Sequence, residues 1–269
     1  MDVKSFSFVC TAPCHREALL LVLSIRRHYA CPIFILCDPI TKGFLSRFQL
    51  GGLIYRGIKQ DSSLDKVLSG IKTQNSFHNK AAIYRKMDVM DWAIRETGNT
   101  FFLDADIVIK SEIHKDITHP VMLSPHYYMI DPGTNRSFRN KYGGFNAGYV
   151  FSSEEGFGDE WKNIYLNRSS FYEQEGMSLL FEVFDTGKFD ATHNVGFWRY
   201  PVRVKEGKRE LDLKQDLSSV KSFHCHFDRQ TYKKADEGLT QCYDIWSDLC
   251  RSHLPLELEM LAKEFKNTN

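Results

Sequence analysis

Residues 100–110 read TFFLDADIVIK. Two apolar runs of the kind that are buried in strands enclose a pair of carboxylates, Asp104 and Asp106. An ionised carboxylate that is buried without a partner is strongly destabilising, so the fold has to compensate both side chains. Either Asp104 begins a turn and Asp106 is solvated, because Asp is a common turn residue, or the pair binds a ligand.

The first half of the chain alternates strands with helices, and this alternation favours the ligand. A strand–helix–strand order with short connections is typical of a parallel, doubly wound α/β sheet. Such sheets bind ligands beyond the carboxyl ends of their strands, and Asp104 and Asp106 lie at such an end. The predicted strands are 5–10, 31–38, 51–58 and the run before Asp104, and the predicted helices are 14–29 and 79–99.

The second half is less regular but is also predicted to contain strands and helices. A Gly-, Asn- and Arg-rich loop at 131–144 separates two predicted strands, and a loop of that length is more often functional than idle. Helices are expected at 173–184 and at 239–266, where Pro255 breaks the helical run. The predicted strands are 120–125, 145–152, 199–204 and 219–227.

The composition excludes several classes of protein. The 269 residues carry a net charge of +1, so no general electrostatic attraction to nucleic acid is expected. The seven cysteines include no C-x-x-C pair, which argues against a zinc or redox motif. The N-terminal residues are too few and too polar for a signal peptide, and no apolar run approaches the ~18 residues of a transmembrane segment. We therefore expect a cytoplasmic protein.

The spacing of the two carboxylates suggests a metal ion. Oxygen ligands at positions i and i+2 of a strand end suit a hard divalent cation, Mn²⁺ or Mg²⁺. Such ions are commonly bound by one or two carboxylates together with the phosphates of a substrate. Asp104 and Asp106 are therefore candidate ligands of a metal that also contacts phosphate.

The order of several sequence blocks resembles a known family. The blocks read FVCTAP, KAAIYRKMDV followed by FFLDADIVI, GGFNAGYVF, YEQE and FHCHF. Together they span roughly residues 5–230 and resemble the GT-A glycosyltransferases, most of all the branch of glycogenin and the bacterial galactosyltransferases. That branch carries D-x-D within LDxD, then FNAG, a DQD-like element and a late His before Phe or Tyr. The chain departs from it after that His, where DRQTYKK replaces GxxKPW.

The resemblance implies a metal site and a donor site. Asp104 would contact the ribose or the metal, Asp106 would ligate the metal, and His226 would be the third ligand. His224 shares a face with His226 if both lie in a strand, so either imidazole could reach the ion. The residues expected to bind the nucleotide sugar are Thr11, Ala12, Asp38, Lys80, Arg85, Asp104, Ala105, Asn146, Ala147 and Gly148.

For two of these positions, the local sequence bears on the assignment independently of the family resemblance. Lys80 falls on the buried stripe of the predicted helix 79–99 and needs an anion, either Asp104 or a diphosphate oxygen; Arg85 or Lys86 could fill the same role. Asp38 is a weaker candidate, because it could equally begin the turn DPITKG.

The FNAG block has a physical interpretation as well. Ala147 and Gly148 would leave room for a sugar against the strand, and the Asn146 amide would bond sugar hydroxyls. The alternative is a bulge in a core strand that Gly148 marks.

The element YEQE supplies the predicted catalytic residues Glu173, Gln174 and Glu175. They stand where the family has DQD, and they also suit the acidic first turn of a helix. The branch retains the anomeric configuration, and Gln174 would then lie near the anomeric carbon. An inverting enzyme would instead need a base. The candidates are Glu173, Glu175, Asp190 and His193; His193, Asn194 and Trp198 are further expected to line the acceptor side.

The sequence thus predicts one α/β domain over residues 1–269, of the GT-A, Rossmann-like type, with a mostly parallel central sheet flanked by helices and with C-terminal helices. Residues 1–110 would form the nucleotide-binding half, and residues 111–269 the acceptor half and closing helices. The predicted activity is a metal-dependent transfer of a hexose from a nucleotide-diphosphate sugar, with UDP as the commonest nucleotide, to a hydroxyl of a glycan, protein, lipid or modified base.

Two other functions compete with glycosyl transfer. FFLDADIV also fits the nucleophile motif of haloacid dehalogenase-like phosphohydrolases, although that class places the motif on its first strand and needs a later GDxxxD. The only Gly-Asp, in GDEWKN, lacks the second acid. The third hypothesis is a module that binds a nucleotide sugar without turning it over.

Overall fold

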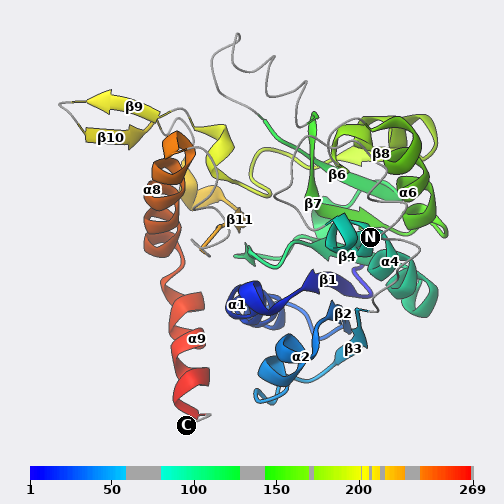
Figure 1. Cartoon of the computed structure of the whole chain (residues 1–269), viewed down its shortest axis with the longest axis horizontal. Helices are drawn as coiled ribbons and strands as arrows, with labels where there is room; N and C mark the ends of the chain where they lie inside the picture. The colour runs from blue at the N-terminus through cyan, green and yellow to red at the C-terminus, as the bar shows by residue number, and fades with distance from the viewer. Residues whose placement is uncertain are drawn as a thin grey trace.

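A seven-stranded sheet forms the centre of the molecule, with helices on both faces (Figure 1). The computed structural model describes residues 1–58, 80–127, 143–169, 173–200, 202–205, 208–212, 216–227 and 237–267. The strand order is β3-β2-β1-β4-β7-β6-β8. Most of the predicted loop at 131–144 lies outside the described residues.

The first four strands in this order are parallel, as the sequence predicts. β1 (Phe6–Cys10) lies between β2 (Ile33–Cys37) and β4 (Thr100–Leu103), and β3 (Leu53–Gly57) forms the edge. β1 and β2 are almost fully buried, which explains their continuous apolar sequences. Their carboxyl ends point to one edge of the sheet, where a ligand site is expected.

The remaining strands make the sheet mixed. β7 (Phe145–Ser152) is antiparallel to both β4 and β6 (Val121–Pro125), and β8 (Thr186–Lys188) is parallel to β6. The sequence does not predict β8, because its three residues, Thr-Gly-Lys, carry no apolar pattern.

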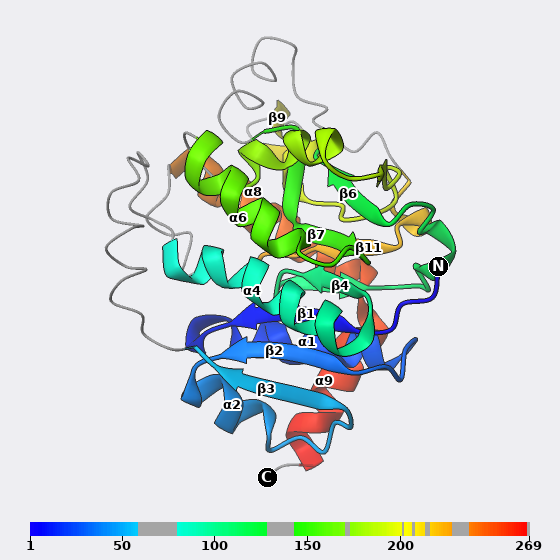
Figure 2. The same cartoon turned by 90° about the vertical axis from the view of Figure 1, so that its right-hand side faces the viewer.

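The helices divide between the two faces of the sheet. α1 (His15–Arg26) and α2 (Pro39–Leu45) cover one face, whereas α4 (Lys80–Thr97) and α6 (Phe157–Arg168) cover the other (Figure 2). The stripe predicted for α4 is buried at Met87, Met90 and Ile94. α1 is buried along most of its length, because the C-terminal helices cover its outer side.

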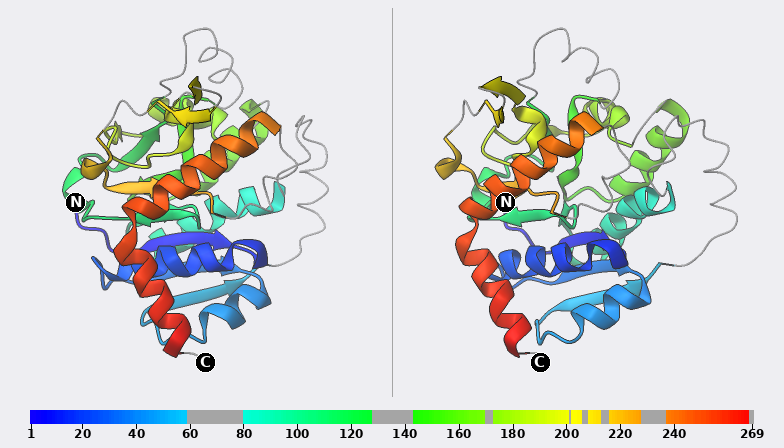
Figure 3. Two further views of the ribbon diagram at one scale, coloured as in Figure 1. Left: turned by 90° about the vertical axis from the view of Figure 1, so that its left-hand side faces the viewer. Right: turned by 60° about the vertical axis from the view of Figure 1, so that its left-hand side comes forward.

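The C-terminal helices meet at the predicted break. α8 (Glu237–His253) ends two residues before α9 (Pro255–Asn267), and proline is well tolerated in the first turn of a helix. Met260, Leu261 and Phe265 of α9 pack against the core cluster around α1 (Figure 3). Within the described part of the chain, no helix has the length and apolar run needed to cross a bilayer.

The stretch 100–110 does not form one strand. β4 ends at Leu103, and β5 (Ile107–Ile109) belongs to a separate two-stranded sheet with β11 (Ser222–His224). Asp104 and Asp106 occupy the turn between the two strands. The predicted strand 219–227 is correspondingly shorter, and the predicted strand 199–204 becomes β9 (Val202–Lys205), which forms a hairpin with β10 (Lys208–Leu211).

The helix predicted at 173–184 is a 3₁₀ helix, η3 (Glu175–Glu182). Its buried residues include Met177 and Leu180, three positions apart, and a 3₁₀ helix places residues i and i+3 on one side. The acidic first turn suits either helix type, so the sequence pattern did not distinguish them.

Gly158 sets the approach of α6 to α4. A Cβ added there would lie 2.4 Å from the Met87 carbonyl oxygen and 2.6 Å from Cγ of Asp91. We expect Gly158→Ala to lower the free energy of unfolding by ~1–3 kcal/mol, measured by urea denaturation, because rigid backbone must move. Gly43 in α2 has no atom within 4 Å of such a Cβ. The control Gly43→Ala should be neutral or stabilising, and equal losses from both substitutions would contradict this explanation.

Candidate active site

The break between β4 and β5 presents the two carboxylates at the carboxyl end of β4. The backbone N–H of Asp104 donates to the Gly148 carbonyl at 2.8 Å, which continues the pairing of β4 with β7 for one residue. The N–H of Ile107 then donates to the Asp104 carbonyl at 3.1 Å and closes a tight turn. This turn directs the chain out of the large sheet, and Asp104 and Asp106 both lie within it.

Asp104 is paired with Lys86, which projects from α4. The Lys86 Nζ lies 2.8 Å from Oδ1 of Asp104 and 3.2 Å from Oε1 of Glu173. Burial lowers the pKa of the Lys86 ammonium, but the Asp104 and Glu173 carboxylates outweigh burial and raise it well above its usual range. Lys86 therefore stays charged and connects Asp104, at the carboxyl end of β4, with Glu173, the residue before Gln174.

Gly148 provides the space that Asp104 occupies. A Cβ at this position would lie 2.3 Å from Oδ2 and 2.7 Å from Cγ of Asp104. The sequence interpretation left this space for a sugar; in the structure the carboxylate fills it. Gly148 also lies where β7 bulges, since the register with β6 shifts between Leu123 and Ser124.

Asp106 lies between two imidazoles. Its Oδ1 is 3.1 Å from Nε2 of His224, and its Oδ2 is 2.8 Å from Nδ1 of His226. Each of the three residues offers one ligand atom, and these atoms lie within 4.8 Å of one another. Burial raises the pKa of the Asp106 carboxyl, but His224 and His226 outweigh it and hold the pKa well below its usual range. We call Asp106, His224 and His226 the metal triad.

The pairing of β5 with β11 brings the histidines to Asp106. His224 lies opposite Ile107 in this pair, and the N–H of Cys225 donates to the Asp106 carbonyl at 2.8 Å. Strand alternation is not what places the two rings together, because β11 ends at His224. Instead His226 has a left-handed φ of 52°, and the two rings stack with centroids 4.4 Å apart.

Aromatic side chains enclose the histidine pair. The Trp198 ring meets His224 edge-on at 5.1 Å between centroids, and Phe197 meets His226 at 5.5 Å. Trp198 is fixed in turn, since its Nε1 donates to the His126 carbonyl at 3.0 Å. Burial lowers the pKa of the His226 imidazole, although Asp106 opposes this effect, and the neutral ring is the form that ligates metals.

The donor set of the triad fits a divalent metal. One carboxylate and two imidazoles offer three ligand atoms and leave further coordination positions for a substrate and water. Imidazole is a better ligand for Mn²⁺ and the later transition metals than for Mg²⁺, which prefers oxygen. Asp104 lies outside the triad, although its charge acts on His226.

The residues predicted to hold the nucleotide lie at the ends of β1 and β2. Asp38 uses both carboxylate oxygens on backbone: Oδ2 accepts from Ala12 N and Oδ1 from Thr41 N, each at 2.7 Å. Burial raises the pKa of Asp38, and these N–H groups outweigh burial and lower it. Asp38 thereby caps α2 and ties the two strand ends together, the alternative that the sequence left open. Thr11 and Ala12 are half-buried beside it.

Three other residues predicted to bind the nucleotide sugar have different surroundings. Lys80 is the first residue of α4, and its side chain lies outside the described part of the structure. Arg85 pairs with Asp88 at 2.8 Å, and Lys86 is the basic residue on Asp104. Ala105 is buried in the core cluster of the α1 face.

The FNAG and YEQE residues divide into buried and accessible ones. Ala147 is fully buried on the α4 face. Asn146 is also buried, and its Oδ1 accepts from Gly148 N at 2.9 Å. Glu173 is buried against Lys86, whereas Gln174 and Glu175 are half-buried at the start of η3.

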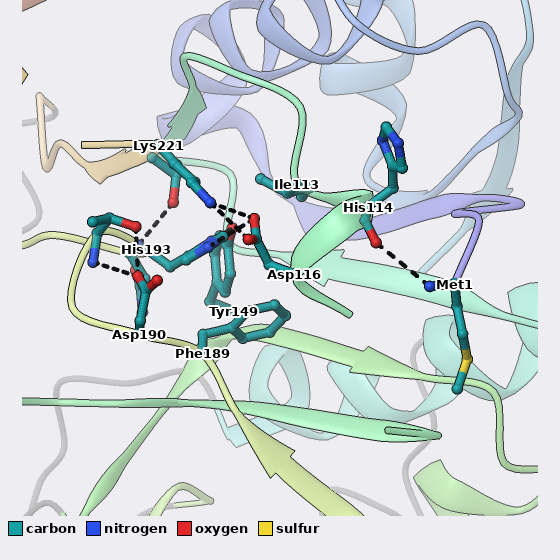
Figure 4. Close-up of polar contacts among 12 residues, drawn as sticks. Met1, Ile113, His114, Asp116, Tyr149, Phe189, Asp190, His193 and Lys221 are labelled. Carbon is teal, nitrogen blue, oxygen red and sulfur yellow. Dashed lines mark hydrogen bonds and ion pairs between the residues drawn. The ribbon is translucent and has the colours of Figure 1, made fainter. Parts of the chain in front are cut away.

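His193 does not line an open acceptor side. It is fully buried, with Nδ1 2.8 Å from the Tyr149 hydroxyl and Nε2 3.2 Å from Oδ2 of Asp116, which Lys221 also binds at 2.7 Å (Figure 4). Asn194, the next residue, bonds His224. Sequence reasoning overlooked this arrangement, and the signal it had was the polar pair His193-Asn194 directly before the apolar Val195.

Comparisons with known proteins identify the fold. The sequence matches no protein-family model and no curated protein. The structure is similar to that of mouse xyloside xylosyltransferase 1 in its apo form, with a TM-score of 0.52, 14% identity, and coverage of 85% of this chain and 99% of that one. The chain has a GT-A, Rossmann-like fold.

Two other solved glycosyltransferases are more distant. GlyE of Streptococcus pneumoniae TIGR4 aligns with a TM-score of 0.45 and 15% identity over 71% of this chain, which spans only 46% of the GlyE chain. A glycosyltransferase involved in glycosylation of the major capsid of PBCV-1 aligns with a TM-score of 0.46 and 11% identity, covering 84% of this chain and 97% of that one.

The burial of His193 predicts a pH-dependent stability. Burial lowers the pKa of its imidazole to about 4, against the opposing charges of Asp116 and Asp190, while Lys221 adds to the lowering. The unfolded chain therefore binds a proton that the folded chain excludes, and stability is lost as pH falls from about 6.5 to about 4. At pH 5 this loss amounts to ~2 kcal/mol relative to pH 7.

His193→Gln, which cannot titrate, should remove that part of the pH dependence. Urea unfolding at pH 5 and pH 7 gives the free energy of unfolding of each protein at both pH values. The change between the two pH values is then compared between His193→Gln and the unmodified chain. A difference between the two pH values that is as large in His193→Gln as in the unmodified chain would contradict the assignment.

Proposed function

We propose that the chain is a metal-dependent glycosyltransferase that takes a sugar from a nucleotide diphosphate. The observation that carries this proposal is the metal triad, Asp106 with His224 and His226, at the carboxyl end of the central sheet. In parallel α/β sheets this edge is where ligands bind. Residues 1–110 would form the nucleotide-binding half and residues 111–269 the acceptor half.

The charges around the triad suit a diphosphate. A metal bound by Asp106 and the histidines would neutralise the phosphates of the leaving nucleotide. Lys86, which binds Asp104 two residues before Asp106, stays protonated, because Asp104 and Glu173 both raise its pKa. Asp104 has about a quarter of its side chain exposed, so it remains accessible to a ribose hydroxyl or to the metal. UDP is the nucleotide we expect, from the family resemblance.

The ligand atoms favour Mn²⁺ over Mg²⁺. Mg²⁺ is bound by oxygen in near-ideal octahedral geometry, whereas two of the three triad ligands are imidazole nitrogens. Mn²⁺ accepts both kinds of ligand and still prefers phosphate oxygens.

The surroundings of the acidic residues support retention of the anomeric configuration. A base for an inverting reaction needs to reach the acceptor proton. Glu173 is bound to Lys86, and His193 is enclosed by Tyr149 and Asp116, so neither is placed for that role. Gln174 follows Glu173 directly and is partly accessible, and its amide could bond the sugar or the acceptor hydroxyl.

The chain's own residues would divide the work as follows. Asp106, His224 and His226 would hold the metal, which supplies electrostatic stabilisation of the departing diphosphate. Lys86 holds the side chains of Asp104 and Glu173 in place. Trp198 and Phe197 pack against the two imidazoles and restrict their orientation. Gln174 would orient the reacting sugar. The acceptor hydroxyl would attack the anomeric carbon from the same side as the leaving group, while the bond from that carbon to the diphosphate oxygen breaks and the hydroxyl proton passes to the departing oxygen.

A phosphohydrolase is less well supported. In the haloacid dehalogenase-like class the D-x-D follows the first strand, whereas here it follows β4. Asp106 would act as acid and base in that class, but two imidazoles hold it. A module that binds a nucleotide sugar without turnover is the other alternative, and it predicts donor binding with no product.

Replacing Asp106 tests the metal. Asp106→Asn is nearly isosteric but loses the charge, so we expect transfer from the UDP sugar to fall at least ~100-fold with the fold intact. Asp159→Asn is the matched control, because that carboxylate is largely exposed and pairs with Lys162. Product formation in Mn²⁺ and in excess chelator is the readout. Undiminished transfer by Asp106→Asn, or in chelator, would exclude a metal-dependent reaction.

The stereochemical course tests Gln174. Gln174→Ala should lower kcat more than it raises KM, because the amide contact would strengthen in the transition state. Proton NMR of the first product gives the anomeric configuration directly. A product inverted relative to the donor would rule out retention and leave Glu175 or Asp190 as the base.

A further inference from the structure

One imidazole of the metal triad has a polar partner on each side. The Nε2 of His224 faces Oδ1 of Asp106 at 3.1 Å, and its Nδ1 lies 3.0 Å from Oδ1 of Asn194. His224 and Asn194 are both buried, so no bulk water competes for these contacts. Whether Nδ1 of His224 carries a proton therefore depends on which atom of the Asn194 amide faces it.

The contacts of Asn194 decide the orientation of its amide. Its Nδ2 lies 3.1 Å from Oδ1 of Asn146 and 3.0 Å from Oγ of Ser124. The Asn146 Oδ1 is identified as an oxygen independently, because it accepts from the backbone N–H of Gly148 at 2.9 Å. If the Asn194 amide were flipped, its Oδ1 would lie 3.1 Å from Oδ1 of Asn146, and two acceptors would face each other. The Asn194 Oδ1 must therefore face His224, and it can only accept a hydrogen bond.

One proton of the His224 ring is then assigned. An oxygen that only accepts requires a proton on Nδ1 of His224. Nε2 faces the Asp106 carboxylate at 3.1 Å and is therefore the nitrogen that a metal would bind, in place of any proton shared with Asp106. Hydrogen bonds of this kind fix the orientation of metal-binding histidines and make them better ligands. A backbone N–H in the FNAG block thus determines, through Asn146 and Asn194, which nitrogen of His224 is free to bind.

The backbone of Asn194 is held as firmly as its side chain. Its φ of 51° is left-handed, a conformation that Asn adopts more readily than most residues. Its N–H donates to Oγ of Ser222 at 2.7 Å, and its carbonyl accepts from the guanidinium of the buried Arg199 at 3.1 Å. Arg199 also binds the His193 carbonyl at 2.6 Å, so one buried cation fixes the whole turn.

We propose that Asn194 is a positioning residue for the metal site, which it serves by presenting Nε2 of His224 to the ion. The proposal rests on the proposed metal-dependent function, but it concerns metal binding and not sugar transfer. Asn194 contacts His224 and would act on the ion through that ring.

Two substitutions distinguish the effect of the Asn194 oxygen that accepts from His224 from the effect of the Asn194 side chain as a whole. Asn194→Gly removes the amide and keeps the left-handed backbone free of strain. Asn194→Asp keeps an oxygen that accepts from Nδ1–H of His224. Asn99→Ala is the matched control: Asn99 is also a buried asparagine with two backbone bonds, to Lys4 N at 2.8 Å and Asp2 O at 3.0 Å, and it is remote from the triad.

The decisive measurement is Mn²⁺ binding by the protein alone, followed by electron paramagnetic resonance at one fixed pH. We expect Asn194→Gly to raise the Kd for Mn²⁺ about 10–100-fold, the range found for such supporting hydrogen bonds. Asn194→Asp should recover only part of that loss, because it restores the acceptor for His224 but sets its second oxygen against Oδ1 of Asn146. Asn99→Ala should leave Kd unchanged even if it lowers the Tm. A Kd for Asn194→Gly equal to that of the unmodified chain, or equal losses in all three variants, would overturn the proposal.

A second readout needs neither metal nor substrate. NMR of the metal-free protein should show a slowly exchanging Nδ1 proton on His224, and this signal should disappear in Asn194→Gly. If the unmodified chain lacks the signal, the proton assigned to Nδ1 is refuted. If Mn²⁺ binds as expected but no sugar is transferred, the proposed function fails and Asn194 keeps its role. If the unmodified chain binds no Mn²⁺, both proposals fail.

Discussion

The site depends on one change of partner in the backbone. The chain pairs with β1 and β7 up to Leu103, turns through Asp104 and Asp106, and then pairs as β5 with β11. This second pairing brings His224 and His226, more than a hundred residues later in sequence, onto the Asp106 carboxylate. A continuous strand through 100–110 would keep the carboxylates in the large sheet and leave the histidines elsewhere.

Buried charge around this turn is compensated locally. Lys86 lies between two carboxylates, and Asp106 lies between two imidazoles. An unpaired ion in such a place would be strongly destabilising, so each group restricts its neighbours to a narrow arrangement. The same restriction prepares the site for a ligand, because little reorganisation is needed when phosphate and metal bind.

Sequence patterns predicted the elements whose periodicity is strong and local. The stripe of α4, the apolar strand β2 and the break at Pro255 all depend on neighbouring residues, and the structure has them near the expected positions. η3 and β8 were not predicted correctly, because a short 3₁₀ helix and a three-residue strand carry little periodic signal. Lys86 was named only as one alternative, since helical spacing alone does not identify a partner across the fold.

Apolar periodicity and the cost of burying charge were enough to predict the α/β class and a pair of carboxylates at the end of a buried strand. The candidate histidines came instead from the resemblance of the FHCHF block to the GT-A glycosyltransferases. The folded arrangement was needed to show that Asp104 binds Lys86 while Asp106 binds the histidines, and that Asn194 contacts His224. Those contacts join segments far apart in sequence, so they arise from strand pairing and packing, and no local pattern encodes them.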